Sequence, residues 1–325
     1  MSAVLILNHD DVIAALPPQE CADAMAAVLV ARARGEAQMP LRSMVPFDGA
    51  AGFMGLMPAW RGGEDPVFSL KALCVMPANP ARGLDSHQGT VTLFDGGTGE
   101  PRAILDASAV TAIRTAAVSA VATRVLAREE ARVLAILGAG VQGKAHLRAL
   151  SSVREFADVR VYSPTEAHAR AVAGGDGRAR VTASAEEAVR GADVVVLATT
   201  SLEPVVRRDW LAPGTHVNAV GASIPSAREL DTATVAECAL YCDSRESLRN
   251  EAGEYLRAVR EGAIGGEDHV RGELGEVLAG NAPARSGEEE LTVFRSLGLA
   301  VEDLAAAECA VAAARRLGIG TEVEL

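Results

Sequence analysis

The chain has 325 residues, which is enough for two packed domains or for one domain with a large insertion. Hydrophobic residues make up 49% of the chain and charged residues 23%, a composition typical of a globular protein and too apolar for a disordered one. The formal net charge of −12 argues against a nucleic-acid partner, because little positive charge is left to displace counterions from phosphates. The acidic balance is most simply interpreted as a solvated surface.

The five cysteines are scattered, with no C-x-x-C pair and no histidine at ligand spacing. This pattern predicts neither a disulfide framework nor a zinc site, and we expect no bound metal. The first residues lack the basic region and the apolar length of a signal peptide, and no segment approaches a membrane span. We therefore expect a soluble cytoplasmic protein with no membrane partner.

The first 115 residues contain short predicted elements separated by proline and glycine. A helix is predicted over 17–35, with Pro18 near its start and Gly35 at its end. Strands or short apolar segments are predicted at 2–7, 42–48, 51–60 and 67–77, and as a pair joined by a glycine-rich turn within 89–107. Strands spaced this closely predict an antiparallel or mixed sheet that is curled or barrel-like.

From residue 115 onward, predicted strands and helices alternate. Helices are predicted at 115–127, 141–153, 164–174, 186–192 and 296–318. Strands are predicted at 132–140, 158–163, 193–200, 215–222 and 238–244. Continuously apolar strands between helices predict a parallel sheet covered on both faces.

Three glycines, Gly138, Gly140 and Gly143, follow the first of these strands and precede a helix. In a dinucleotide-binding loop the first glycine permits a tight turn, the second lets the backbone approach a pyrophosphate, and the third lets the helix pack on the strand. A purely structural turn is the alternative. The strand–helix alternation that follows favours cofactor binding.

The end of the next strand bears on the choice of cofactor. Its tip carries Ser163, Pro164 and Thr165, where an NAD site usually has an acidic residue for the ribose. Without a carboxylate to repel a 2′-phosphate, the tip favours NADP. NAD stays possible, because no arginine is present at the tip and Glu166 is close by.

Several segments around this loop resemble the ornithine cyclodeaminase/mu-crystallin family. They are "GLMPAW", "SHQGTVTLFD", "IRTAAVSAVATRVL", "AILGAGVQG", "HVNAVGASIPSARELD" and "VFRSLGLAVEDLAAA", and together they extend over nearly the whole chain. The resemblance implies an α/β fold, in which a Rossmann-type, doubly wound parallel sheet at 116–291 is inserted in an α+β domain at 1–115 and 292–325. It further implies that the α+β domain binds substrate and forms a homodimer, with strands of both subunits in a shared barrel.

Three cations, Arg42, Lys71 and Arg114, match the substrate site of the family. Lys71 alternates inward with apolar neighbours on a predicted strand, where a buried ammonium is costly unless it meets an anion. The guanidinium of Arg114 suits a carboxylate bidentately. We therefore expect these cations to bind the carboxylate of a small imino or amino acid, and we expect Met57 to contact the same substrate. A structural ion pair or a solvated side chain is the alternative for each.

Two positions depart from the cyclodeaminase pattern. Ser223 and Gly55 occupy positions where cyclodeaminases carry an aspartate and a glutamate, so two proton-transferring groups are missing. The "GAS" sequence is similar to that of the mu-crystallin, or ketimine reductase, branch, which largely uses NADPH. Reduction of a preformed C=N bond requires mainly orientation and a hydride.

By family match, we expect the cofactor to contact residues from both parts of the chain. They are Ser86, His87, Thr115, Gly138, Ala139, Gly140, Val141, Gln142, Gly143, Ser163, Pro164, Thr165, His168, Thr199, Thr200, Val220, Ser223 and Ser296. A structural role for His87 and a helix-cap role for Ser296 are equally good interpretations. Glu302 and Asp303 are expected to stabilise the N-terminal end of the last helix.

These features predict an NADP-preferring oxidoreductase that reduces small cyclic imino acids to cyclic L-amino acids. Lys71, Arg114 and Ser223 are the expected catalytic residues. One alternative is an ornithine cyclodeaminase or an alanine dehydrogenase-type enzyme. A second is a protein that binds NADP and a small ligand without catalysis.

Overall fold

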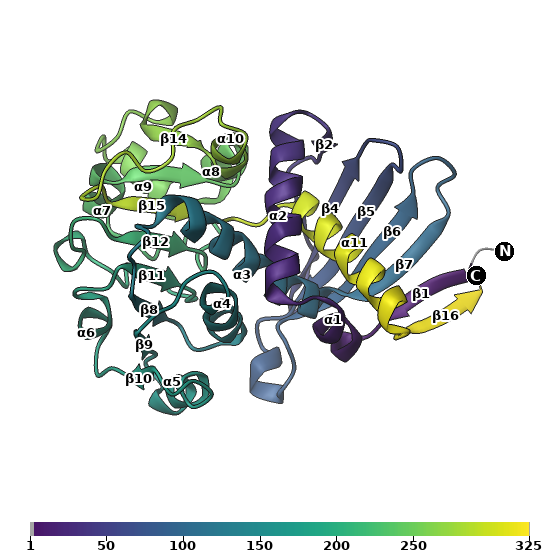
Figure 1. Ribbon diagram of the computed structural model, residues 1–325, viewed down its shortest axis with the longest axis horizontal. Coiled ribbons are helices and arrows are strands. Elements are labelled where there is room, and N and C mark those ends of the chain that lie inside the picture. The colour runs from purple at the N-terminus through teal and green to yellow at the C-terminus, as the bar shows by residue number, and fades with distance from the viewer. Residues whose placement is uncertain (1–2, 325) are drawn as a thin grey trace. The chain divides into compact units, whose positions relative to one another are not determined.

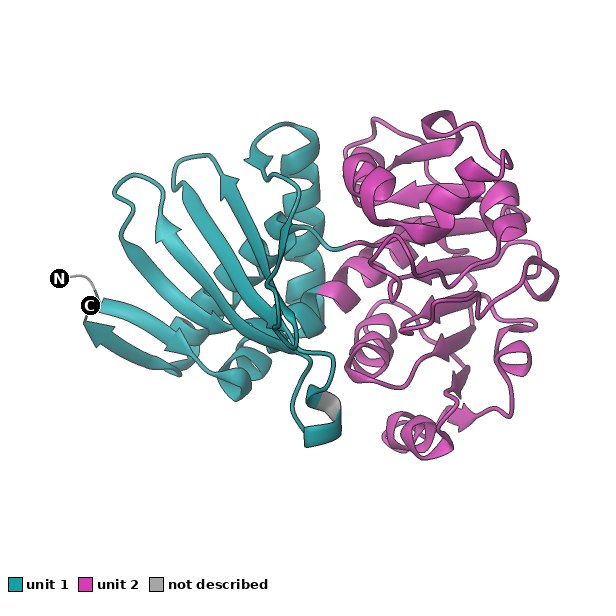
Figure 2. Ribbon diagram, turned by 180° about the vertical axis from the view of Figure 1, so that it is seen from behind, with its two compact units in different colours: residues 1–114, 298–325 teal, residues 115–297 magenta. Residues whose placement is uncertain are grey.

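The computed structural model describes residues 3–324, which form two compact units. The first unit contains both ends of the chain, up to Arg114 and from Gly298, and the second comprises Thr115–Leu297 (Figure 2). The expected start of the C-terminal part at residue 292 is corrected to 298. The reason is that strand β15 (Thr292–Arg295) pairs in the sheet of the second unit.

The first unit has an eight-stranded mixed sheet. Its order is β16–β1–β7–β6–β5–β4–β2, with β3 on β4, and all pairs are antiparallel except β1 with β7. No pair between described strands closes this order, so the expected barrel is not formed within one chain. The strands are β1 (Ala3–Leu7), β2 (Ala37–Gln38), β3 (Ser43–Pro46), β4 (Phe53–Arg61), β5 (Val67–Val75), β6 (His87–Asp95), β7 (Pro101–Asp106) and β16 (Thr321–Glu324).

Helices α1 (His9–Ala15), α2 (Pro18–Ala33) and α11 (Ala300–Leu317) cover one face of this sheet (Figure 1). The side chain of Asn8 accepts from the backbone of Asp11 and starts α1, a helix that the sequence pattern missed. Helix α11 packs on β4, β5 and β6. One short 3-10 turn, η1 (Asn79–Arg82), precedes β6.

The second unit has a parallel sheet with the order β10–β9–β8–β11–β12–β15–β13–β14. Its direction of growth reverses between β8 and β11, the switch point where doubly wound sheets bind ligands. The predicted Rossmann-type fold is thus confirmed. The strands are β8 (Val133–Leu137), β9 (Asp158–Tyr162), β10 (Ala179–Val181), β11 (Val194–Leu197), β12 (His216–Ala219), β13 (Ala239–Cys242), β14 (Val270–Glu273) and β15.

Alternate residues of the strands in the second unit face two separate hydrophobic cores. Ala135 and Leu137 of β8 belong to one core, whereas Leu134 and Ile136 belong to the other. The helices are α4 (Val141–Ser151), α5 (Glu166–Ala173), α6 (Ala185–Val189), α7 (Thr232–Glu237), α8 (Arg245–Glu251), α9 (Gly253–Arg260) and α10 (Leu274–Leu278), with the 3-10 turns η2 (Arg208–Trp210) and η3 (Glu267–His269). Both faces of the sheet are therefore covered, as expected.

Helix α3 (Ala107–Leu126) contains the boundary between the two units. Contrary to expectation, it is long and apolar enough to cross a membrane, but 72% of its apolar window is buried inside the protein. Burial of this extent is typical of a core helix.

Candidate functional site

The glycine loop between β8 and α4 has the geometry of a dinucleotide-binding turn. Gly138 has a φ of 105°, and a Cβ atom there would lie 2.2 Å from the carbonyl oxygen of Ala198. A Cβ atom on Gly143 would lie 2.1 Å from the carbonyl oxygen of Gly138, so helix α4 packs directly on the loop. Only glycine fits at these two positions.

Gly140 differs from these two glycines, because a Cβ atom added to it would meet nothing within 4 Å. It is the N-cap of α4, and no side chain caps the helix there. The first turn of α4 begins with Val141 and Gln142, and Ala139 precedes it in the loop. Backbone N–H groups at such an uncapped helix start suit the oxygens of a pyrophosphate. The loop therefore fits the cofactor that its sequence predicts.

The other predicted cofactor residues of the second unit follow the carboxyl ends of its strands, except Thr115. Ser163, Pro164 and Thr165 follow β9, Thr199 and Thr200 follow β11, Val220 and Ser223 follow β12, and Ser296 follows β15. His168 is exposed in the first turn of α5. Thr115 is buried within α3, next to Arg114.

Ser296 is buried, and among the described residues its hydroxyl has no hydrogen-bond partner. It does not cap the last helix, whose N-cap is Leu299, so the helix-cap interpretation is wrong. A buried hydroxyl without a protein partner fits a polar group of a ligand.

A buried cluster of charges occupies the first unit, beneath the N-terminal end of α11. Lys71 projects from β5 and its ammonium lies 2.8 Å from Oδ2 of Asp303. The same ammonium donates to Oγ1 of Thr111 at 3.2 Å. Only 2% of the Lys71 side chain is exposed. The inward direction expected from strand alternation is what the burial pattern of β5 shows.

Arg114 belongs to the same cluster. Its Nε donates to Asp303 and its Nη1 to Glu302, both at 2.9 Å. The backbone of Gly298 crosses the guanidinium so closely that a Cβ atom would lie 2.8 Å from Nη1. The structural ion pair weighed for Lys71 and Arg114 therefore exists, and a substrate-binding role for them stays a prediction.

Glu302 and Asp303 do more than stabilise the helix end. Glu302 accepts from the backbone N–H of Leu299 at 3.1 Å, in agreement with the expected role. Both carboxylates are also almost fully buried against the two cations. Sequence pattern missed this pairing, although acidic residues inside an apolar helix are a signal for buried cationic partners.

The electrostatics of the cluster shift its proton affinities. Burial lowers the pKa of Lys71 to about 8, although the Asp303 carboxylate opposes the change. Burial alone would raise the pKa of Asp303, but Arg114 and Lys71 outweigh it and hold the pKa below its ordinary value. Partial loss of hydration, followed by the charges of Lys71 and Arg114, lowers the pKa of His87.

The remaining predicted residues of the first unit lie around this cluster. Met57 is buried on β4 directly opposite Lys71. Arg42 is half-buried before β3, and its charge acts on both Lys71 and His87. Ser86 bonds to Nδ1 of His87 at 2.9 Å at the start of β6.

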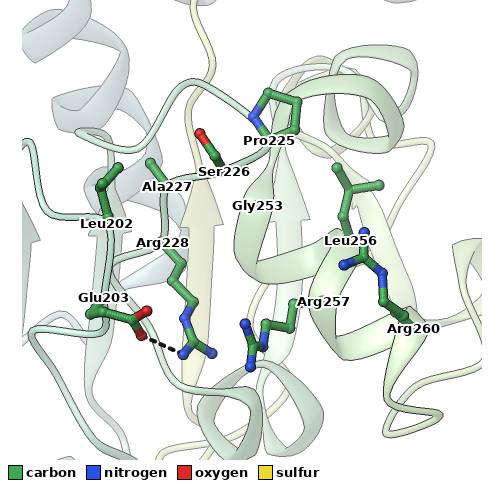
Figure 3. A pocket seen from close by; sticks show the side chains of 10 residues that line it. All are labelled: Leu202, Glu203, Pro225, Ser226, Ala227, Arg228, Gly253, Leu256, Arg257 and Arg260. Atoms are coloured by element: carbon green, nitrogen blue, oxygen red, sulfur yellow. Dashed lines mark hydrogen bonds and ion pairs between the residues drawn. The ribbon is translucent and has the colours of Figure 1, made fainter.

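A cavity of about 140 Å³ opens in the second unit beside the loop after β12 (Figure 3). None of its lining residues is a predicted site residue; they are Leu202, Glu203, Pro225, Ser226, Ala227, Arg228, Gly253, Leu256, Arg257 and Arg260. Among its lining residues, Arg228 donates to Glu203 at 2.6 Å, and Arg257 donates to Glu261 at 2.8 Å. Two of its three arginines thus have carboxylate partners.

Comparison with known proteins gives consistent matches over the chain. Residues 3–315 match the ornithine cyclodeaminase/mu-crystallin family. Ketimine reductase mu-crystallin from Mus musculus is 42% identical over 275 residues, 84% of this chain and 84% of that protein. A solved structure of Delta(1)-pyrroline-2-carboxylate reductase from Thermococcus litoralis, in complex with NADH and L-proline, is 34% identical with a TM-score of 0.92, covering 98% of this chain and 100% of that one. An archaeal alanine dehydrogenase dimer with bound NAD is 33% identical with a TM-score of 0.93, covering 100% of both chains.

Proposed function

The chain belongs to the ornithine cyclodeaminase/mu-crystallin family, and on that premise we propose that it reduces small cyclic imino acids to cyclic L-amino acids. The reaction is a nicotinamide-dependent reduction of a C=N bond. The mouse relative is a ketimine reductase, and the Thermococcus litoralis relative is a reductase of pyrroline-2-carboxylate, a five-membered cyclic imine that carries a carboxylate. We expect a substrate of the same class.

The observation that carries this proposal is the buried lysine with a pKa of about 8 in a cluster of matched charges. A general acid is most effective when its pKa lies near the working pH. The ammonium of Lys71 supplies the proton that the imine nitrogen needs, and Asp303 holds the ammonium in place. Ser223 and Gly55 offer no carboxylate for the additional proton transfers of a cyclodeaminase.

When bound, the nicotinamide cofactor supplies a hydride, which adds to the carbon of the C=N bond. The protonated imine nitrogen takes up the electron pair of that bond and becomes an amine. Arg114 and Arg42 bind the substrate carboxylate next to the C=N bond and thereby orient the substrate for the reaction. The positive charge of Arg42 acts on Lys71 and His87 and adds to the attraction that this part of the first unit has for an anionic substrate.

Our proposal includes NADPH as the preferred cofactor. The tip of β9 carries Ser163 and Thr165, whose hydroxyls can donate to a 2′-phosphate, and it lacks a carboxylate that would repel one. We expect this reaction to take place in the cytoplasm.

We also propose a homodimer formed through the outer face of the first sheet. Helices cover only the other face of this sheet (Figure 2). On β4 and β5, Met54 and Phe68 are 37% and 47% exposed. Both side chains lie on the face that the helices leave uncovered, and an uncovered apolar sheet face is typical of an interface. The alanine dehydrogenase relative is a dimer.

The test is the loss of absorbance at the nicotinamide band, with NADPH and with NADH. Pyrroline-2-carboxylate and piperideine-2-carboxylate are the expected substrates, and ornithine and pyruvate with ammonia are the comparison compounds. The proposal predicts rapid oxidation of NADPH with at least one cyclic imine. Proline formed from ornithine without net cofactor consumption would instead indicate a cyclodeaminase, and tight binding of cofactor without any turnover would indicate a binding protein.

A further inference from the structure

A single buried carboxylate joins two of the loops at the carboxyl end of the second sheet. Oε1 of Glu229 accepts from the backbone N–H of Thr199 at 2.7 Å and from its hydroxyl at 2.8 Å. Oε2 accepts from the backbone N–H groups of Gly221 at 2.7 Å and Ala222 at 3.2 Å. Glu229 is fully buried, so these four bonds replace its hydration.

The two loops that Glu229 joins are in direct contact. A Cβ atom on Gly221 would lie 2.0 Å from the carbonyl oxygen of Thr199 and 2.6 Å from Oε1 of Glu229. The loop after β12 is therefore held against the loop after β11, and the carboxylate determines the direction of four donors, three backbone N–H groups and one hydroxyl. Ser223 is the residue immediately after Gly221 and Ala222, whose backbone N–H groups Glu229 binds.

Two further buried charges extend this connection to β15. Nη1 of Arg295 donates to the carbonyl oxygens of Ala219 at 2.6 Å and Ser296 at 3.1 Å. Its Nε lies 2.8 Å from a carboxylate oxygen of Glu254 on α9. Burial raises the pKa of Glu229, and the positive charge of Arg295 opposes this change. All three side chains are at most 3% exposed.

The strand order assigns these loops to one half of a dinucleotide. The pyrophosphate belongs at the glycine loop after β8, and the adenosine ribose belongs at the tip of β9 on one side of it. The strands β11, β12 and β15 follow on the other side. Their carboxyl-end loops are thus left for the nicotinamide half.

We propose that Glu229 is a positioning residue for the nicotinamide half of the cofactor. Its carboxylate fixes the loops that carry Thr199 and Ser223, while Arg295 and Glu254 fix the ends of β12 and β15. This inference rests on the proposed function only in that the cofactor is a nicotinamide dinucleotide.

The test compares the whole cofactor with its adenosine half in the Glu229→Gln variant. The glutamine amide has the same size, but its NH2 group faces N–H donors, so the two loops lose their fixed arrangement. Within the described residues, the side chain at position 229 forms no hydrogen bond to the glycine loop or to β9. We expect the Kd for NADPH, measured by calorimetry without any imine, to rise about tenfold or more. The Kd for 2′,5′-ADP should stay within about twofold of the wild-type value. Hydrogen exchange in the free variant should accelerate at the amides of Thr199, Gly221 and Ala222.

Glu203→Gln is the matched control, because Glu203 follows the same strand as Thr199 but is exposed and pairs with Arg228. It should leave both affinities unchanged. Equal weakening of NADPH and 2′,5′-ADP in E229Q, or no weakening of either, would overturn the proposal. If E229Q does not fold, Glu229→Asp is tested in its place, with a smaller but equally selective loss expected. Wild-type protein that binds NADPH but reduces no imine would refute the proposed function and leave this test unaffected.

Discussion

For Lys71, the sequence predicts the inward direction of the side chain but not its buried partner. Its inward direction follows from the alternation of β5, a local property of the sequence. Its partner Asp303 lies far away along the chain, and only the packing of α11 on β5 brings the two together. For the same reason, the local sequence around Glu302 and Asp303 predicts only a helix N-terminus. Their main partners are two cations from distant segments of the chain.

The pKa of Lys71 predicts the pH dependence of the reaction. In the proposed reaction Lys71 acts as an acid and must be protonated, so we expect activity to be fully present below a pKa of about 8 and to be lost as the pH rises through it. We expect kcat/KM for pyrroline-2-carboxylate to fall about tenfold for each unit of pH above that value. A profile of kcat/KM that stays level up to pH 10 would contradict the assignment of Lys71 as the acid.

Replacing Lys71 by methionine should abolish most of the activity, because it removes the acid and leaves Asp303 without one of its two cations. We expect kcat to fall by a factor of about 100 or more. NADPH affinity should change little, because the glycine loop and the tip of β9 belong to the second unit and Lys71 does not. Arg316→Met, an exposed cation near the end of α11, is the control with unchanged kcat. Equal kcat values in the two variants would refute the catalytic role.

The glycine loop is the element that sequence spacing predicts best, because a tight turn and a helix start are local structures that require glycine at fixed positions. What spacing does not reveal is which glycine serves the fold and which serves the ligand. Gly138 is required by its φ of 105° and by the nearby backbone of Ala198, whereas Gly140 faces open space. Contacts between loops, such as Gly221 against Thr199, are invisible in the sequence for the same reason.

This difference predicts opposite effects for two alanine substitutions. Gly138→Ala forces a side chain into positive φ and against the backbone of Ala198, which follows β11, so unfolding in urea should show a loss of about 1–3 kcal/mol or more. Gly140→Ala should keep the free energy of unfolding nearly unchanged but weaken NADPH binding. Equal stabilities of the two variants would contradict this account of the loop.

At the scale of the molecule, alternating elements predict the parallel sheet but not its order. Strand β15 lies between β12 and β13, although it comes after β14 in the chain, and only long-range pairing places it there. The final strand β16, which pairs with β1, carries four exposed residues and no apolar alternation strong enough to predict it. The membership of the ends of the chain in one unit followed from resemblance, not from local pattern.

The uncovered sheet face predicts the effect of a charge on assembly. Phe68→Asp places a carboxylate on the outer face of β5, so we expect the sedimentation mass to fall from that of a dimer to that of a monomer. Leu317→Asp is the control, since Leu317 is 59% exposed at the end of α11 and away from this face. A dimer that persists in F68D would locate the interface elsewhere.

Two buried histidines predict loss of stability in acid. Burial lowers the pKa of His146 to about 4 and that of His216 to about 3, from an ordinary 6.5. Their contribution to stability is therefore fully present above pH 6.5 and is lost as the pH falls toward those values, by about 1.4 kcal/mol per pH unit for each group. The free energy of unfolding should fall less steeply between pH 6 and 4.5 in the variant that carries His146→Gln and His216→Gln. Equal slopes would show that neither histidine is buried in its neutral form.

The central claim is that a hydride passes from the nicotinamide to the carbon of a cyclic C=N bond. It is tested most directly with NADPH that carries deuterium at the transferred position and with pyrroline-2-carboxylate as substrate. We predict L-proline with one deuterium at Cα, formed in proportion to the cofactor consumed. Proline without the label, or cofactor that is never consumed while ornithine is converted to proline, would contradict the claim.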